Sequence, residues 1–313
     1  MTQDGNTIAF LDSTYGGAAD RLYLFKRSGM KWHKQCEYIV SCWDFSLSSY
    51  DGKRVAFRGD KNTVIINTIN PNQTNQVILE DSASGILSTP NGNTVATDPY
   101  IKVKISGDSN TLLVSYPEYE LTPLYDSVSS NVQTAGVVDA YSYSSSSNKW
   151  TLDARLRSNN PVANAKFGNS LAITNDGNRV FVGFGGSGTG SGDRIEIFSR
   201  VPGTGGTYGG GWSQLQTIYD PTTSPASTGN SPYGFGARIS VASDGRNVAL
   251  SSPWWHATGS SSSSWPQGGI YIYYWNGSNY NTNTNTYEFA NGAVNEHLGW
   301  EIDLSGDGRT LLV

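Results

Sequence analysis

Apolar and polar residues alternate along much of the chain in short segments that end at Gly-rich or Asp-Gly turns. Three such stretches align without gaps, namely FGNSLAITNDG at 167–177, FGARISVASDG at 235–245 and LGWEIDLSGDG at 298–308. In each stretch apolar residues stand at every second position before the aspartate, which is the period of a half-buried strand. The Asp-Gly pair favours a tight hairpin turn. The pattern therefore predicts an antiparallel strand pair that repeats along the chain.

Two further strands complete the repeat. After the second strand, a loop of variable length leads to a third strand, at 194–198 or 269–274, and a second turn leads to a fourth strand, at 212–218 or 287–290. Four antiparallel strands in succession are typical of one blade of a β-propeller. We therefore predict an all-β fold, a β-propeller of four-stranded antiparallel blades with about five to seven blades.

We expect one propeller domain over residues 1–313, whose blade boundaries follow the repeat. The expected segments are a partial blade at 1–40, blades at about 43–81, 100–157, 166–219 and 234–290, a partial blade at 297–313, and an extra hairpin at 85–97. Both chain ends fall inside blades. This favours an incomplete ring or a fragment of a longer repeat array, and closure of the ring by the first partial blade stays an alternative.

The segments FGNSLAITNDGNRVFVGF at 167–184, RIEIFSR at 194–200 and GWSQLQTI at 211–218 resemble the FG-GAP type of propeller repeat. The resemblance is good over 167–313 and weaker before. It implies an adhesion or recognition surface, as in integrin-α-like heads, and no enzyme. Calcium-binding members carry several Asp or Asn residues between the second and third strands, but 185–193 and 252–269 lack them. We therefore expect no metal and no cofactor.

Composition and charge narrow the expected partners and location. Charged residues make up 15% of the chain, below the roughly 25% of typical soluble domains, while Gly, Ser, Asn, Thr and Tyr are abundant. This profile indicates an extracellular or particle-surface protein. The net charge of -5 gives no excess of positive charge to attract a nucleic-acid phosphate backbone. No apolar window approaches the ~18 residues that span a bilayer. We expect no nucleic-acid partner and no direct membrane insertion.

Two kinds of covalent modification are suggested by the sequence. Cys36 and Cys42 are the only cysteines, and their short separation allows a small disulfide loop, with two free thiols as the alternative. Asn72 and Asn276 begin Asn-X-Ser/Thr tripeptides in expected turns, which makes them candidate glycosylation sites. Such tripeptides also arise by chance in a chain rich in Asn, Ser and Thr.

The long loops between second and third strands carry the candidate ligand-binding residues, and in a propeller these loops emerge on one face. The candidates are Trp254, Trp255, His256 and Trp265 in one loop, and Tyr116, Glu118, Tyr119 and Tyr125 in another. Exposed aromatic rings and carboxylates suit stacking on sugars or anchoring a protein partner. In the alternative interpretation the aromatic rings cap their own loops and seal them onto the next blade.

The leading functional interpretation is a non-enzymatic recognition or assembly module on an extracellular, filament or virus-particle surface, which binds a protein or glycan partner within a larger assembly. A lectin-like carbohydrate-binding propeller is the first alternative. The second is a glycoside hydrolase, which needs a pair of carboxylates from Asp44, Glu301 and Asp303 on inner strands. Because no catalytic motif is recognisable, we predict no enzyme activity and no catalytic residue.

Overall fold

A computed structural model of the chain describes residues 1–12, 20–40, 44–50, 52–58, 64–68, 101–147, 149–185, 194–221, 234–253, 268–281, 285–287 and 298–313. The chain forms two compact units. Unit 1 comprises residues 1–114, 140–152 and 175–177, and unit 2 comprises residues 115–139, 153–174 and 178–313. The expectation of one propeller domain stays a prediction, and the extra hairpin expected at 85–97 lies outside the described residues.

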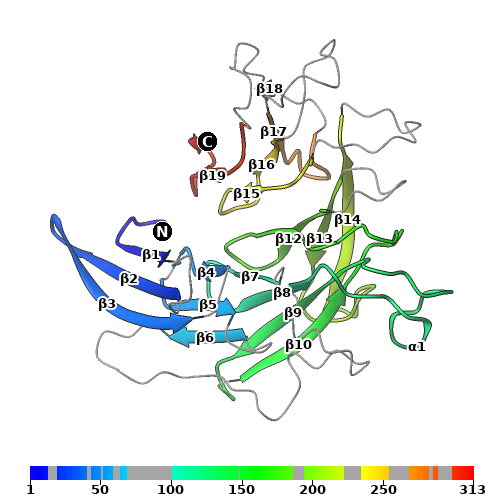
Figure 1. Ribbon diagram of the computed structural model, residues 1–313, viewed down its shortest axis with the longest axis horizontal. Helices are drawn as coiled ribbons and strands as arrows, with labels where there is room; N and C mark the ends of the chain where they lie inside the picture. Colours follow the sequence, from blue (N-terminus) through cyan, green and yellow to red (C-terminus); the bar gives the residue numbers. More distant parts are fainter. Residues whose placement is uncertain are drawn as a thin grey trace. The chain divides into compact units, whose positions relative to one another are not determined.

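The described residues form antiparallel sheets of three, three, four, four, four and two strands, in chain order (Figure 1). The first two sheets comprise β1 (Thr7–Asp12), β2 (Asp20–Ser28) and β3 (Lys31–Val40), then β4 (Phe45–Leu47), β5 (Arg54–Arg58) and β6 (Val64–Thr68). The third comprises β7 (Lys102–Ile105), β8 (Thr111–Tyr116), β9 (Val137–Ser144) and β10 (Lys149–Leu156). The predicted all-β architecture of four-stranded antiparallel sheets is confirmed.

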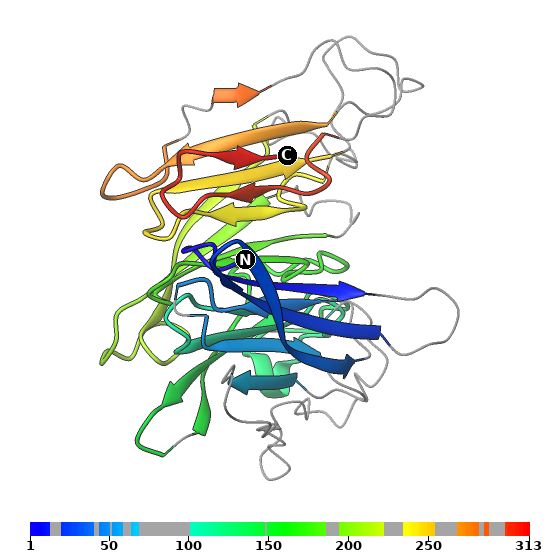
Figure 2. The same cartoon turned by 90° about the vertical axis from the view of Figure 1, so that its left-hand side faces the viewer.

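The remaining sheets hold the three aligned repeats. They comprise β11 (Ser170–Ile173), β12 (Arg179–Gly183), β13 (Arg194–Arg200) and β14 (Trp212–Tyr219); β15 (Ile239–Val241), β16 (Asn247–Ser252), β17 (Gly269–Tyr274) and β18 (Asn285–Tyr287); and β19 (Asp303–Leu304) with β20 (Leu311–Leu312). Within unit 2, the β19–β20 hairpin lies beside β15 and β16 (Figure 2). No helix in the described part of the chain is long and apolar enough to cross a membrane.

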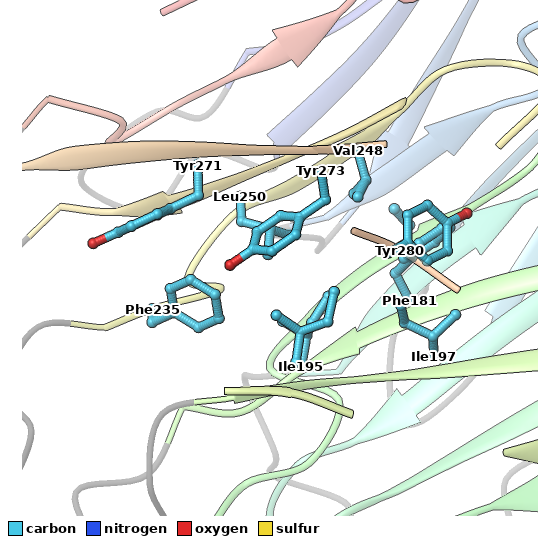
Figure 3. Packing of buried hydrophobic residues seen from close by; sticks show 11 residues of the cluster. Phe181, Ile195, Ile197, Phe235, Val248, Leu250, Tyr271, Tyr273 and Tyr280 are labelled. Atoms are coloured by element: carbon cyan, nitrogen blue, oxygen red, sulfur yellow. The ribbon is translucent and has the colours of Figure 1, made fainter. Parts of the chain in front are cut away.

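Apolar side chains at alternate positions of the strands form the core of unit 2, which lies between the sheet β11–β14 and the sheet β15–β18 (Figure 3). Side chains from the two sheets point toward one another in the close-up view. They include Phe181, Ile195, Ile197, Val248, Leu250, Tyr271 and Tyr273, and Phe235 and Tyr280 join them from the segments before β15 and after β17. Burying each large apolar side chain stabilises the fold by roughly 1.5–3 kcal/mol. A separate cluster in unit 1 buries Leu22, Leu24, Tyr38, Val55 and Phe57 between its first two sheets.

The Phe-Gly and Leu-Gly pairs let neighbouring sheets pack closely. Gly168, Gly236 and Gly299 have φ values of +96°, +79° and +88°, a region that side-chain-bearing residues rarely adopt. A Cβ at Gly236 would lie 2.6 Å from Ile195 Cγ2, and one at Gly299 would lie 2.8 Å from Ser251 Cβ. Glycine is therefore required where the chain enters an inner strand against the preceding sheet.

A hydroxyl two positions before the turn aspartate organises the hairpin between the first two strands of a repeat. Ser106 Oγ accepts the Thr111 N–H at 2.9 Å and donates to Asp108 Oδ1 at 2.5 Å. Thr2 and Ser305 make the corresponding contacts in their own turns. The side chains thus satisfy backbone donors that the turn would otherwise leave unpaired.

Backbone hydrogen bonds join successive turns of unit 1. The Gln3 N–H donates to Ser49 O at 2.6 Å, and the Tyr50 N–H donates to Gly107 O at 3.2 Å. The Asp108 N–H then donates to Asn175 O at 2.8 Å. In unit 2, the Ser243 N–H donates to Gly306 O at 2.9 Å. Because these bonds use backbone groups alone, they hold the turns in register whatever side chains the turns carry.

In each unit, an arginine at the start of the second strand of a repeat lies against two aromatic rings of the next repeat. The Arg54 guanidinium lies 3.7 Å from the Tyr143 ring centroid and 5.8 Å from that of Trp150. In unit 2, the Arg179 guanidinium lies 4.1 Å from the Trp275 ring centroid and 5.6 Å from that of Tyr280. These distances are typical of cation–π contacts.

Candidate functional site

In the first loop predicted to bind a ligand, residues 116–136, Tyr116 and Tyr119 point inward. Tyr116 and Tyr119 are only 4% and 5% exposed. The Tyr119 hydroxyl donates to Asp126 Oδ2 at 3.3 Å, and the Arg155 guanidinium lies 5.3 Å from the Tyr119 ring centroid. Burial, together with the Asp126 charge, raises the pKa of Tyr119 to about 12. These two rings therefore stabilise the loop and present little surface to a ligand.

Glu118 is the predicted loop residue whose carboxylate stays partly open. It pairs with Lys166 at 2.6 Å, and both side chains are about one-third exposed. Backbone hydrogen bonds hold the loop on both sides, from the Gly136 N–H to Tyr119 O and from the Lys166 N–H to Thr134 O. Tyr125 lies in α1 (Pro123–Asp126). The ligand-binding role of this loop stays a prediction.

Several other predicted residues lie outside the described residues, namely Trp254, Trp255, His256, Trp265, Cys42 and Asn72. Cys36 is half-buried in β3 opposite Leu24, and its disulfide with Cys42 stays a prediction. Asn276 lies in an exposed turn, where its Oδ1 accepts the Ser278 and Asn279 N–H groups at 3.0 Å. Its position on the surface is confirmed, and its glycosylation stays a prediction.

An exposed ion pair joins two neighbouring inner strands of unit 2. Arg238 immediately precedes β15 and Glu301 lies two residues before β19, and Arg238 Nε lies 3.0 Å from Glu301 Oε1. The Arg238 side chain is 40% exposed and that of Glu301 is 74% exposed. Both charges are therefore held in place yet open to a solute. A charge pair with this exposure contributes little to stability.

A second polar pair lies two residues further along the same strands. The Ser240 hydroxyl donates to Asp303 Oδ1 at 3.3 Å and accepts the Leu304 N–H at 2.9 Å. Side chains two residues apart on a strand point to the same face. The four residues therefore form one polar row across β15 and the β19 strand, which we call the inner-strand row: Arg238, Ser240, Glu301 and Asp303.

The sequence identified the acids of this row and missed its basic partner. Glu301 and Asp303 were candidates as inner-strand carboxylates, whereas Arg238 and Ser240 occupy the same two offsets in the second aligned repeat. Comparing these offsets across repeats would have found them. Asp44, the third candidate, lies in unit 1, where its Oδ2 accepts the Val103 N–H at 2.9 Å.

A buried polar cluster in unit 2 has a different character from the inner-strand row. Glu196 Oε1 accepts from Ser158 Oγ at 2.7 Å and from Arg194 Nε at 3.1 Å. All three residues are buried: Glu196 and Ser158 are 2% exposed, and Arg194 is 5% exposed. Burial raises the pKa of Glu196, and its bonds to Ser158 and Arg194 partly oppose this. The described ranges hold no group of three His, Cys, Asp or Glu placed to bind a metal ion.

Comparisons with solved structures support the fold. The chain is similar to a putative 6-phosphogluconolactonase from Bacteroides uniformis, with 14% identity and a TM-score of 0.51, covering 98% of this chain and 74% of that one. It is also similar to a periplasmic gluconolactonase from Pseudomonas aeruginosa, with 14% identity and a TM-score of 0.52, covering 99% and 75%. A putative 6-phosphogluconolactonase from Bacteroides fragilis matches with 11% identity and a TM-score of 0.50, covering 99% and 74%.

At these identities the similarity shows the fold alone, and the fold class is a β-propeller-type all-β architecture. No protein-family model matches the chain, and no curated protein matches its sequence. The resemblance to the FG-GAP repeat stays a prediction.

Two functional predictions from the sequence are contradicted by these findings. The proteins that share the fold are named as a gluconolactonase and two putative 6-phosphogluconolactonases. These are names of enzymes, so the interpretation as a non-enzymatic surface module and the prediction of no enzyme activity need correction. The physical reason lies in the architecture. Inner strands of different blades bring together residues far apart in sequence, so the absence of a local motif excludes no catalytic site.

Proposed function

We propose that this protein is a hydrolase that opens the ester ring of a sugar lactone, with the inner-strand row as part of its active site. The observation that carries the proposal is the exposed Arg238–Glu301 pair on neighbouring inner strands, which holds a base and a cation 3.0 Å apart. The names of the proteins with the same fold support the choice of substrate class.

The reaction needs a base for water and a cation for the negative charge that develops on the carbonyl oxygen. The Glu301 carboxylate takes a proton from water while the water oxygen bonds to the lactone carbonyl carbon. Arg238 stabilises the resulting oxyanion. When the bond between that carbon and the ring oxygen breaks, Glu301 returns the proton to the ring oxygen. One water molecule is consumed, and the product is the open-chain hydroxy acid.

Ser240 and Asp303 suit the sugar hydroxyl groups of such a substrate. Asp303 is exposed, and an ionised carboxylate accepts hydrogen bonds at both oxygens. The Ser240 hydroxyl fixes one Asp303 oxygen at 3.3 Å, which leaves the other free to accept from a substrate hydroxyl. In this role the pair orients the ring, and the Arg238–Glu301 pair acts on its ester bond.

The test is hydrolysis of glucono-δ-lactone and of its 6-phosphate, measured as acid release above the rate in buffer alone. We expect Glu301→Gln to lower kcat about 10²–10⁴-fold because it removes the base, and Arg238→Met to lower it about 10²–10³-fold. Asp12→Asn, which neutralises an exposed carboxylate at the end of β1, is the matched control and keeps full activity. A wild type no faster than buffer, or a fully active Glu301→Gln, refutes the proposal.

We also propose that the enzyme acts outside the cytoplasm. The low fraction of charged residues, 15%, and the periplasmic location in the name of one protein with the same fold support this. Fractionation of cells that make the protein tests it, and recovery with cytoplasmic marker enzymes contradicts it.

A further inference from the structure

The hairpin of β2 and β3 ends in a segment of unusual charge, residues 26–34 (KRSGMKWHK), which we call the basic tip. Lys26, Arg27, Lys31 and Lys34 lie in it together with His33, and it contains no acidic residue. All nine residues are exposed. A local basic surface of this kind is conspicuous because the whole chain carries a net charge of -5.

The apex of the basic tip is apolar. Met30 is 92% exposed and Trp32 is 40% exposed. Gly29, the first residue of the two-residue loop, has a φ of +63°, which permits the tight turn that projects Met30 at the end of the hairpin. Exposing a methionine almost completely has no benefit for folding. The apex therefore presents an apolar group to the surroundings of the unit.

The cations surround this apex on both faces of the hairpin. Lys26 pairs with His33 in register, and Arg27 pairs with Trp32. Because successive side chains on a strand point to opposite faces, Lys26 and His33 lie on one face and Arg27 and Trp32 on the other. A ligand that approaches end-on would therefore meet an apolar apex ringed by positive charge.

Three of the cations lack an acidic partner in the described part of the chain, although Arg27 Nε donates to Gly29 O at 2.8 Å. Lys34 pairs with Glu37 at 2.9 Å, whereas Lys26, Arg27 and Lys31 make no ion pair within the described residues. Behind them, Phe10, Tyr23 and Phe25 stack on one face of β1 and β2, with ring centroids 5.2 Å and 5.5 Å from Phe10. The stack stiffens the base of the hairpin, so the tip is presented by a rigid support.

We propose that the basic tip is a peripheral membrane-docking surface for lipids with anionic phosphate headgroups. A lipid interface takes up an apolar side chain below its headgroups and attracts lysine and arginine at the headgroup level. The end-on arrangement matches a flat interface better than a single-stranded nucleic acid, which needs a groove of cations along one face. The acidic remainder of the chain is repelled by the same lipids, which leaves the tip as the point of contact.

The test is co-sedimentation of the whole chain with phosphatidylcholine vesicles that contain or lack phosphatidylglycerol, at two salt concentrations. We expect binding to the anionic vesicles alone, and weaker binding at higher salt. The triple variant Lys26→Gln, Arg27→Gln, Lys31→Gln should bind about a hundredfold more weakly. Met30→Ser should bind several-fold more weakly because it removes the inserted group.

The control triple variant is Lys149→Gln, Arg246→Gln, Arg309→Gln, which removes three exposed cations elsewhere and so changes net charge equally. It should bind as the wild type does. Equal loss in both triple variants would reduce the effect to net charge and overturn the proposal. No binding to anionic vesicles, or tip-dependent binding to an oligonucleotide or polyglutamate instead, would overturn it too. Lactone hydrolysis should be unchanged in the tip variants, so the two proposals fail independently.

Discussion

Replacing Arg179 tests whether the arginine held between aromatic rings stabilises unit 2. Arg179 Nη1 donates to the Tyr280 hydroxyl at 2.9 Å, and the guanidinium lies 4.1 Å from the Trp275 ring centroid. Arg179→Met keeps an apolar chain of similar reach and removes both contacts. A hydrogen bond from a charged group contributes about 1.5 kcal/mol or more, and a partly desolvated cation–π contact about 1–2 kcal/mol. The expected loss in free energy of unfolding is therefore about 3 kcal/mol.

The assay is urea denaturation followed by tryptophan fluorescence. Arg246→Met is the matched control, because Arg246 has a side chain that is 77% exposed, and it should change the free energy of unfolding by no more than about 0.5 kcal/mol. A double-mutant cycle with Tyr280→Phe should give a coupling energy of about 1 kcal/mol, since the two side chains are hydrogen-bonded. Equal losses for Arg179→Met and Arg246→Met, or an additive cycle, would refute the stabilising role.

Three further predictions address the packing and the polar contacts. Gly236→Ala should destabilise the protein by about 2 kcal/mol or more, because φ is +79° and the new Cβ would meet Ile195 Cγ2 at 2.6 Å; an unchanged urea midpoint contradicts this. Ser106→Ala should cost about 1–2 kcal/mol, because the Thr111 N–H loses its acceptor; a urea midpoint equal to that of the wild type contradicts this. Glu196→Gln should match the wild type at acid pH and become relatively more stable as pH rises above about 4.5. The pKa of Glu196 is higher in the folded protein than in the unfolded chain, so its contribution to stability is full below the unfolded pKa and is lost as the pH rises through the folded pKa. A difference in denaturation midpoint that does not change with pH argues against this prediction.

The strands and their turns could be predicted from sequence because both depend on local patterns. The alternation of apolar residues, together with the Asp-Gly turns, predicted β11, β12 and β13 to within a few residues of their observed bounds. The role of the Phe-Gly glycine could not be predicted, because the atom that excludes a side chain at Gly236 belongs to Ile195 in the preceding sheet. Contacts between sheets depend on residues far apart in the chain.

The candidate site was harder to predict than the fold, for the same reason. Aromatic residues in long loops suggested ligand binding, but Tyr119 is buried because Asp126 and Arg155 surround it. Glu301 drew attention as an acid on an inner strand, yet its partner Arg238 lies 63 residues away in the chain. The ion pair forms only when the two repeats lie side by side, so the sequence of either repeat alone does not show it.

The hydrogen bonds between turns of unit 1 have a consequence for how the repeats influence one another. The peptide group between Ser49 and Tyr50 accepts from Gln3 with its carbonyl and donates to Gly107 with its N–H, and the next peptide group, between Gly107 and Asp108, does the same toward Asn175. The peptide dipoles therefore align head to tail, and each bond polarises the next. A change that tilts one of these peptide groups would weaken two bonds at once, so strain in one turn would be felt in both of its neighbours.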